Sequence, residues 1–330
     1  MKTKEYHFKS GDLLQQVDSF AEKGVLQVIV DDPLLTSNKE KFLQLLVAIP
    51  EKAPSVFFQF YIDPSILDKE IICAFADIFC SLHLYVYGQD RKNLSRKAAL
   101  LNDIGLVFGF EVQQKGGDNP FASVREFRDL LDFLITLYPN HLYFNTETME
   151  PTAKLSTQDI KNLERMIFAV VTFYSYGRAV PWFNAALAPL KIRPSQFFTD
   201  FAEWQLCNHC SLTDSQNGIF DVNKTSHSEI EKMQLHFLRL KYEEKQLSHL
   251  YTALFDMIRL QGAFSRVAAG EGNNKEISLG YECLLELSYH PDDLLSPFAM
   301  DIPLFVEEVC METCKIRVFA GQSGPEIDIL

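Results

Sequence analysis

Short apolar runs recur five times in the first 150 residues, starting near positions 25, 55, 82, 106 and 140. Each run precedes a stretch whose apolar residues repeat with helical spacing, so one strand and one helix together occupy about 25 to 35 residues. Consecutive βα units of this length predict a parallel sheet. We therefore expect an α/β fold that begins with a partial (βα) barrel of about five to six parallel strands.

The boundaries of these units follow from turn and capping residues. Gly24 is a predicted helix C-cap, and Asn119 with Pro120 predicts the start of a regular amphipathic helix. The expected strands cover residues 25–30, 55–62, 82–87, 106–112 and 141–145. The expected helices between them cover residues 38–49, 66–80, 92–103 and the stretch after Pro120.

The pattern changes after Pro151 and becomes mostly helical. Ser156 and Asp159 predict a capping box, and the polar stretch 211–228 is typical of a linker. A small terminal sheet is expected from a strand at 283–289 and a hairpin near the C-terminus. The other expected helices cover 156–176, 179–189, 195–208, 228–261 and 302–313. We divide the chain into a barrel at 1–155, a helical extension at 156–210 and a C-terminal domain at 211–330.

Composition narrows the function classes. The 330 residues are 47% hydrophobic and include 27 phenylalanines, enough for a large core. A net charge of −13 argues against a nucleic-acid-binding surface, which needs a basic face. No run approaches the roughly 20 apolar residues of a membrane span. Seven scattered cysteines are typical of a reducing compartment, so we expect a cytoplasmic protein.

Candidate functional residues lie where the strands end, because parallel βα folds gather their sites at the carboxyl ends of strands. Two adjacent carboxylates beside a buried strand need solvent, hydrogen bonds or a partner. Alternatively, Asp32 caps the next loop while Asp31 faces solvent, and Glu111 pairs with a lysine or arginine. The candidate ligand-binding residues are Asp31, Asp32, Asp63, Gly88, Gln89, Glu111, Asn145 and Glu147. We expect His83 and His141 to begin strands at the opposite mouth of the barrel, where residues serve stability.

These strand ends resemble those of radical S-adenosylmethionine (SAM) proteins, in particular the cobalamin-associated type with a C-terminal domain of unknown function. The resemblance rests on four segments, which lie at residues 28–39, 84–89, 143–155 and 287–292. The first looks like the second barrel strand with its acidic end, and the next like the fourth strand with its Gly-Gln turn. The third is similar to the sixth strand and its turn, and the last to part of the tail domain. The resemblance implies SAM, a [4Fe–4S] cluster and possibly cobalamin as family cofactors.

The chain departs from that family at its defining motif. The Cys-x3-Cys-x2-Cys loop that holds the cluster has no counterpart, because no cysteine precedes Cys73. We expect that the first strand, the cluster loop and a cobalamin-binding domain are missing, and that this chain alone binds no cofactor. Two later pairs, Cys207 with Cys210 and Cys310 with Cys314, could in principle form a four-thiolate site. Ordinary core or incidental thiols are the alternative, and no metal site is expected.

Three hypotheses for function remain open. The chain is the SAM- and substrate-embracing remainder of a radical SAM enzyme whose cluster another segment or partner supplies, or it is a degenerate, non-catalytic binding module. The third hypothesis is an unrelated βα-barrel enzyme that uses Asp31, Asp32 and Glu111 with a divalent metal. An incomplete barrel exposes sheet edges, which a cluster-bearing partner or a second copy of the chain would cover.

Overall fold

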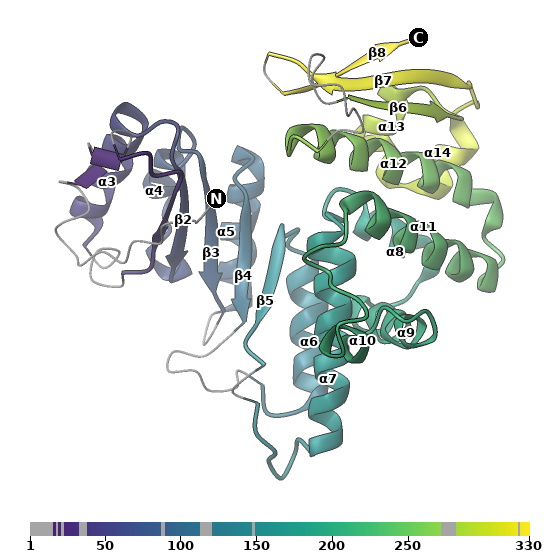
Figure 1. Cartoon of the computed structure of the whole chain (residues 1–330), viewed down its shortest axis with the longest axis horizontal. Coiled ribbons are helices and arrows are strands. Elements are labelled where there is room, and N and C mark those ends of the chain that lie inside the picture. Colours follow the sequence, from purple (N-terminus) through teal and green to yellow (C-terminus); the bar gives the residue numbers. More distant parts are fainter. Residues whose placement is uncertain are drawn as a thin grey trace. The chain divides into compact units, whose positions relative to one another are not determined.

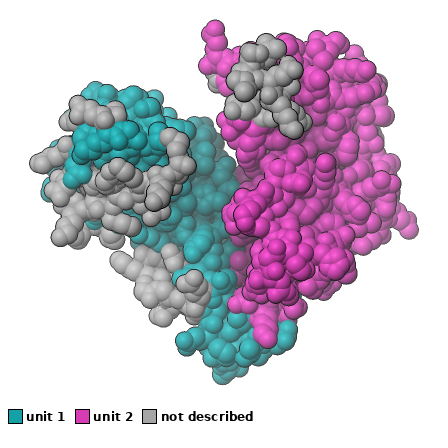
Figure 2. All heavy atoms as spheres, in the orientation of Figure 1, with its two compact units in different colours: residues 1–160 teal, residues 161–330 magenta. Residues whose placement is uncertain are grey.

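The chain folds into two compact units, Met1–Ile160 and Lys161–Leu330 (Figure 2). The computed structural model describes residues 16–17, 19–20, 23–32, 38–86, 90–112, 121–146, 149–271, 282–322 and 324–330. The separation of 156–210 from 211–330 as independent parts stays a prediction. Among the described residues, every helix is too short or too polar to cross a bilayer.

A five-stranded parallel sheet forms the centre of the N-terminal unit (Figure 1). Its strands follow one another in space in the same order as in the chain, which is the arrangement that successive βα units produce. The strands are β1 (Gln27–Val30), β2 (Phe57–Ile62), β3 (Cys80–Tyr85), β4 (Phe108–Val112) and β5 (His141–Phe144). The predicted α/β class, with parallel strands and alternating helices, is confirmed.

Helices connect these strands, and capping side chains set several of their ends. Asn38 accepts a hydrogen bond from the Lys41 amide at the start of the first helix. Gly105, with φ 76°, ends the helix Arg91–Ile104 in the left-handed conformation that favours glycine. The connecting elements are α3 (Lys39–Lys52), η1 (Pro64–Ile66), α4 (Lys69–Ala74), α5 (Arg91–Ile104) and α6 (Val124–Ile135).

Two predicted helices of this unit were wrong in their extent. The helix expected over 66–80 is the short α4, because Asp68 caps its start and β3 already begins at Cys80. The helix expected to begin after Pro120 begins at Val124 instead. Its N-cap is Ser123, whose hydroxyl accepts from the Glu126 amide, while Asn119 and Pro120 lie outside the described residues.

One face of the sheet is an apolar layer against helices. The Phe60 ring of β2 meets Phe42 of α3 at 6.1 Å and Phe75 at 5.1 Å, both edge-on. At the other end of the sheet, Phe144 of β5 contacts Phe127 of α6 at 5.3 Å. These rings are almost fully buried, so this face supplies the core of the unit.

Helices dominate the C-terminal unit, and Phe173 lies at the centre of their packing. It sits in η2 (Val171–Tyr176), a π-helical turn that continues α7 (Thr157–Val170). Its ring contacts six others, all near edge-on: Trp182, Phe183, Phe197, Phe198, Phe201 and Phe237. These residues come from or adjoin α8 (Phe183–Leu190), α9 (Pro194–Cys207) and α11 (His227–Glu244).

Three predictions for this unit were wrong. The expected linker contains α10 (Leu212–Gln216), because Ser211 and Asp214 form a capping box there. The single helix expected over 228–261 is two, α11 and α12 (Tyr251–Ala268), separated at Gln246, whose φ is 59°. The last helix, α14 (Ile302–Glu308), ends before Cys310.

A three-stranded antiparallel sheet follows α12, as the sequence predicted. Its order is β6 (Glu282–Leu287), β7 (Cys314–Ala320) and β8 (Pro325–Ile329). Two side chains of α12 bind the end of β6: the Arg259 guanidinium donates to the Glu286 carbonyl at 2.9 Å, and Asp256 accepts from the Ser288 amide. Between α12 and α14 lie the short α13 (Pro291–Leu295) and η4 (Pro297–Met300).

Candidate functional site

The second face of the parallel sheet is polar. Successive residues of a strand point to opposite faces of the sheet. The paired Phe60 and Leu82 lie on the apolar face, so the next pair, Tyr61 and His83, lies on the second face. The register then sets Tyr61, His83, Gly109 and His141 in one row across β2 to β5. Parallel sheets are normally apolar on both faces. We call the side chains Asp31, Tyr61, His83, Tyr85, Glu111 and His141, with Gly109, the polar face.

Three side chains converge at the centre of the polar face. The His83 Nδ1 atom lies 2.8 Å from Glu111 Oε1 and 3.1 Å from His141 Nε2. Among the described residues, these three form the group of potential metal ligands whose donor atoms all lie within 4.8 Å of one another. Only 3% of Glu111 and 9% of His83 is exposed, so both are shielded from bulk water. We call this group the His–Glu–His cluster.

Gly109 makes this convergence possible. A Cβ atom at position 109 would lie 2.2 Å from both Cδ2 and Nε2 of the His141 imidazole. Carbon atoms do not approach so closely, so the missing side chain provides the space that the His141 ring occupies. Burial, followed by the neighbouring His83, lowers the pKa of His141 to about 3, which keeps its imidazole neutral at physiological pH.

A tyrosine–aspartate pair lies on the same face. The Tyr85 hydroxyl donates to Asp31 Oδ1 at 3.2 Å, joining β3 to the end of β1 across β2. Burial raises the pKa of Tyr61 to about 12, and the charges of Glu111 and Asp31 add to this. The pKa of Tyr85 rises for the same reasons. Both phenols therefore stay protonated and can donate hydrogen bonds to a ligand.

The structure brings together only part of the predicted site. Asp31 and Glu111 both belong to the polar face, whereas Asp63 caps η1 by accepting from the Ser65 amide at 2.8 Å. Asp32 and Asn145 are half-buried at the ends of β1 and β5. Gly88, Gln89 and Glu147 lie outside the described residues.

The expectation that His83 and His141 both begin strands at the opposite mouth of a barrel is met only in part. His83 does not begin its strand: β3 begins at Cys80, so His83 lies within it, next to Glu111. His141 does begin β5, but the parallel register sets it level with His83 rather than at a separate mouth. The signal in the sequence was the alternation of apolar and other residues along β3 and β4. His83 and Glu111 both occupy the non-apolar positions of that alternation.

The cysteine pairs do not form a comparable cluster in the described part of the chain. Cys310 and Cys314 were expected on one helix, but Cys310 follows α14 and Cys314 begins β7. Cys207 is exposed and Cys210 is buried. Burial raises the pKa of the Cys210 thiol to about 11, so it is not a thiolate at neutral pH.

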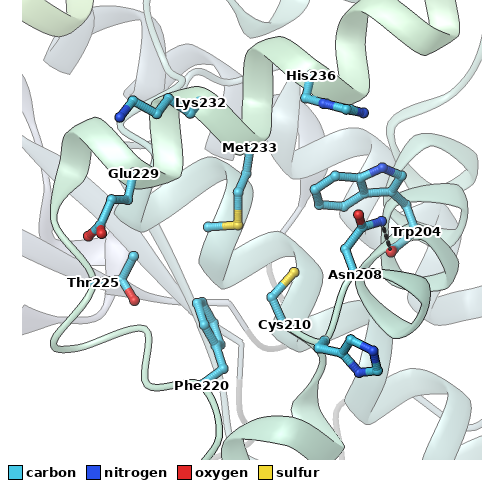
Figure 3. A pocket seen from close by; sticks show the side chains of 10 residues that line it. Trp204, Asn208, Cys210, Phe220, Thr225, Glu229, Lys232, Met233 and His236 are labelled. Atoms are coloured by element: carbon cyan, nitrogen blue, oxygen red, sulfur yellow. Dashed lines mark hydrogen bonds between the residues drawn. The ribbon is translucent and has the colours of Figure 1, made fainter.

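Cys210 also lines a pocket of about 490 Å³ in the C-terminal unit (Figure 3). The Trp204 indole forms one wall and stacks on Phe201, with ring centroids 5.4 Å apart. Lys232 and His236 of α11 reach its rim and are exposed. The pocket is open to solvent, and its polar side chains do not converge on one point in Figure 3.

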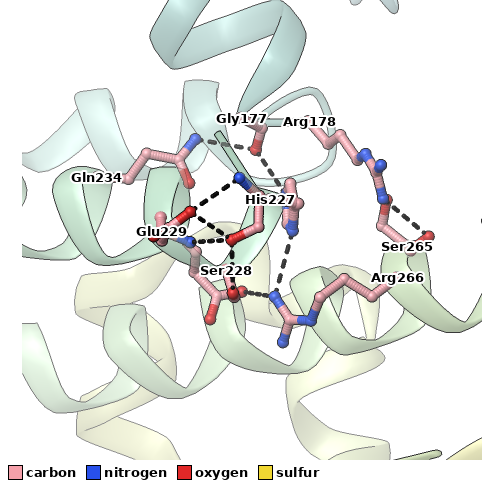
Figure 4. Close-up of polar contacts among 10 residues, drawn as sticks. Gly177, Arg178, His227, Ser228, Glu229, Gln234, Ser265 and Arg266 are labelled. Carbon is pink, nitrogen blue, oxygen red and sulfur yellow. Dashed lines mark hydrogen bonds and ion pairs between the residues drawn. The ribbon is translucent and has the colours of Figure 1, made fainter. Parts of the chain in front are cut away.

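A buried polar network in the same unit has a structural role (Figure 4). Arg266 donates to Glu231 at 2.6 Å and to His227 Nδ1 at 3.2 Å, which leaves His227 Nε2 to donate to the Gly177 carbonyl. Burial, with the charges of two nearby arginines, lowers the pKa of His227 to about 4. Gln234 also donates to the Gly177 carbonyl, at 2.9 Å. These bonds satisfy backbone groups at the end of η2 and fix α11 and α12 to it.

Comparison with known proteins gives little. No protein-family model matches the chain, and no curated protein matches it. One solved structure with a local likeness is the radical SAM methyltransferase TsrM from Kitasatospora setae, with cobalamin and a [4Fe–4S] cluster bound. The identity is 16% and the TM-score 0.33, over 40% of this chain and 29% of that one. This is a weak structural likeness to a radical SAM protein, and it assigns neither a family nor a function.

Proposed function

We propose that the N-terminal unit binds a small polar ligand on the polar face of its sheet. The observation that supports this most is the contrast between the two faces. A second apolar face would be the normal complement to a helix-covered parallel sheet, yet this one carries acids, imidazoles and phenols. Such groups stay costly in a protein interior unless they bind each other or a ligand.

The radical-SAM-like interpretation of the sequence gives this proposal its specific form. The ligand is then SAM, whose sulfonium and ammonium charges suit the carboxylate of Asp31 and the hydroxyl of Tyr85. In this form the chain is the SAM- and substrate-embracing part of an enzyme, with the [4Fe–4S] cluster supplied from elsewhere, or a degenerate module that binds without chemistry. The run of parallel strands in chain order, as in a βα barrel, supports it.

Calorimetric titration with SAM tests this form. We expect the wild-type chain to bind SAM, and Asp31→Asn to weaken binding at least tenfold. Asp103→Asn is the matched control, because Asp103 is an exposed acid on α5 and loses the same charge. No binding by the wild type, or an equal loss in both variants, would refute the proposal. Iron analysis after anaerobic cluster reconstitution then tests whether this chain holds a cluster of its own. Both the SAM-embracing part and the degenerate module predict no bound iron, and bound iron would show a cluster on this chain.

Association and location belong to the same proposal. Among the described residues the sheet ends at β1 and β5, and sheet edges favour pairing with another chain. We propose a cluster-bearing partner or a second copy as the covering element, which light scattering after size exclusion would detect. All seven cysteines are free, which supports a cytoplasmic location.

A second candidate function is metal-dependent chemistry, the remaining hypothesis from the sequence. The observation that favours it is the position of Glu111, whose carboxylate is hydrogen-bonded to His83 rather than to a lysine or arginine. In this version Glu111 would hold the ion and Asp31 would exchange protons with the substrate, while the Tyr85 hydroxyl would orient Asp31.

A further inference from the structure

We propose that His83 Nδ1, Glu111 Oε1 and His141 Nε2 bind one divalent transition-metal ion. The proposal concerns a metal site alone, and it holds whether or not SAM binds to the polar face. It starts from the convergence of one carboxylate and two imidazoles at the centre of the sheet, with all three donor atoms within 4.8 Å of one another.

The separations between the donor atoms fit a common metal. Zn²⁺ binds histidine nitrogen at about 2.0–2.1 Å and carboxylate oxygen at about 2.0–2.2 Å, so ligands in its coordination sphere lie about 2.9–3.4 Å apart. The His83–Glu111 and His83–His141 separations are 2.8 and 3.1 Å. The two separations that involve His83 therefore need to widen by only a few tenths of an ångström to accept an ion, and the third, between Glu111 and His141, lies within 4.8 Å.

Hydrogen bonding alone satisfies the cluster poorly. If His83 Nδ1 carries a proton, that single proton serves both Glu111 Oε1 and the lone pair of His141 Nε2. If it does not, its own lone pair faces a carboxylate oxygen at 2.8 Å. A cation at the same point accepts a lone pair from all three atoms at once.

Neighbouring residues hold the ligands in position. The second nitrogen of His83 lies 3.4 Å from the Ser81 hydroxyl, and outer-shell bonds of this kind orient metal-binding imidazoles. Tyr61 stacks on the His83 ring at 4.5 Å. Gly109 leaves the space that His141 occupies. The ligands also sit on adjacent strands, which are more rigid than loops.

The donor set indicates the class of metal. Two imidazole nitrogens and one carboxylate oxygen suit Zn²⁺, Fe²⁺ or Co²⁺, whereas Mg²⁺ and Ca²⁺ prefer oxygen ligands only. Three protein ligands leave at least one coordination position for water. Because His141 is partly exposed, that position can open toward solvent.

The test is a Zn²⁺ titration of the metal-free chain against a competing chelator. We expect one ion per chain with submicromolar affinity, no competition from excess Mg²⁺, and at least a hundredfold loss in His83→Ala and in His141→Ala. His249→Ala is the control, because His249 is an exposed histidine of the other unit and its loss should change nothing.

X-ray absorption of the zinc-loaded wild type keeps the test decisive even where a variant fails to fold. A spectrum with two imidazole ligands and no sulfur neighbour around the zinc supports the proposal. Sulfur neighbours would assign the ion to the cysteines and overturn it. Binding that is weaker than micromolar, or equally affected by His249→Ala, would show that the cluster is only a buried hydrogen-bond network.

Discussion

Gly109→Ala tests how the polar face is assembled. The added Cβ would lie 2.2 Å from two atoms of the His141 imidazole. To reach the 3.4 Å at which ordinary contact begins, the ring must retreat by about 1.2 Å. Metal ligands tolerate errors of about 0.2 Å, so this displacement separates His141 Nε2 from the other two donor atoms.

The expected cost combines two opposing effects. Overpacking a filled site costs about 1–3 kcal/mol. Replacing a glycine by alanine also restricts the unfolded chain, which by itself stabilises by about 0.4–1 kcal/mol. We therefore expect Gly109→Ala to lower the free energy of unfolding by about 1–2 kcal/mol. In a His141→Ala background the clash disappears, and the same substitution should become neutral or stabilising.

The assay is urea unfolding of four metal-free proteins: the wild type, the two single variants and the double variant. Far-UV circular dichroism follows both units. Tryptophan fluorescence follows the C-terminal unit, because Trp182 and Trp204 both lie there. Gly109→Ala should shift the dichroism transition in the wild-type background only, and should weaken Zn²⁺ binding at least tenfold. An equal cost in both backgrounds would refute the reasoning, because the strain would then come from the β4 backbone and not from His141.

Other predictions concern the buried histidines, the aromatic core and a helix cap. The pKa values of His141 and His227 are about 3 and 4 in the folded chain, whereas a histidine of the unfolded chain has a pKa of about 6.5. The unfolded chain therefore binds more protons below about pH 6.5, and stability should fall as the pH falls toward 4. His141→Gln should flatten this dependence in dichroism, and His227→Gln should flatten it in fluorescence. Phe173→Ala should destabilise the C-terminal unit by about 3–5 kcal/mol in urea unfolding by fluorescence, and Phe173→Leu by less. Ser226→Ala, which removes the capping box of α11, should cost about 1 kcal/mol in the same experiment, with the exposed Ser248→Ala as control.

The sequence predicted the strand–helix alternation because that pattern is local. Each apolar run is short and is bounded by polar turn residues, and caps such as Asn38 and Ser156 can be read directly. Errors occurred where apolar periodicity continues past a break. Residues 228–261 keep helical spacing through Gln246, yet its left-handed backbone and the 3-10 turn at Ser248–Leu250 separate α11 from α12.

The candidate site depends on information that is not local. The spacing predicted that Asp31 and Glu111 lie at the ends of buried strands, and both belong to the polar face. The pairing of His83 with His141 depends instead on the register of two strands through β4. The predicted β3 began two residues too late, at Leu82, which placed His83 at the start of the strand instead of in its middle.

The burial of Glu111 shows why the cluster is the centre of this face and the strand-end acids are not. A carboxylate such as Asp31 remains exposed and is stabilised by water as well as by Tyr85. Glu111 is 3% exposed, and taking an ionised carboxylate out of water costs several kcal/mol unless a partner compensates it. The partner here is the His83 imidazole, whose Nδ1 atom also lies 3.1 Å from Nε2 of a second imidazole. A divalent ion compensates the same charge more completely, so metal binding should stabilise the N-terminal unit, by an amount that grows with the logarithm of its affinity. The substitution Glu111→Gln should therefore weaken Zn²⁺ binding. It should also reduce the shift that Zn²⁺ causes in the midpoint of urea unfolding.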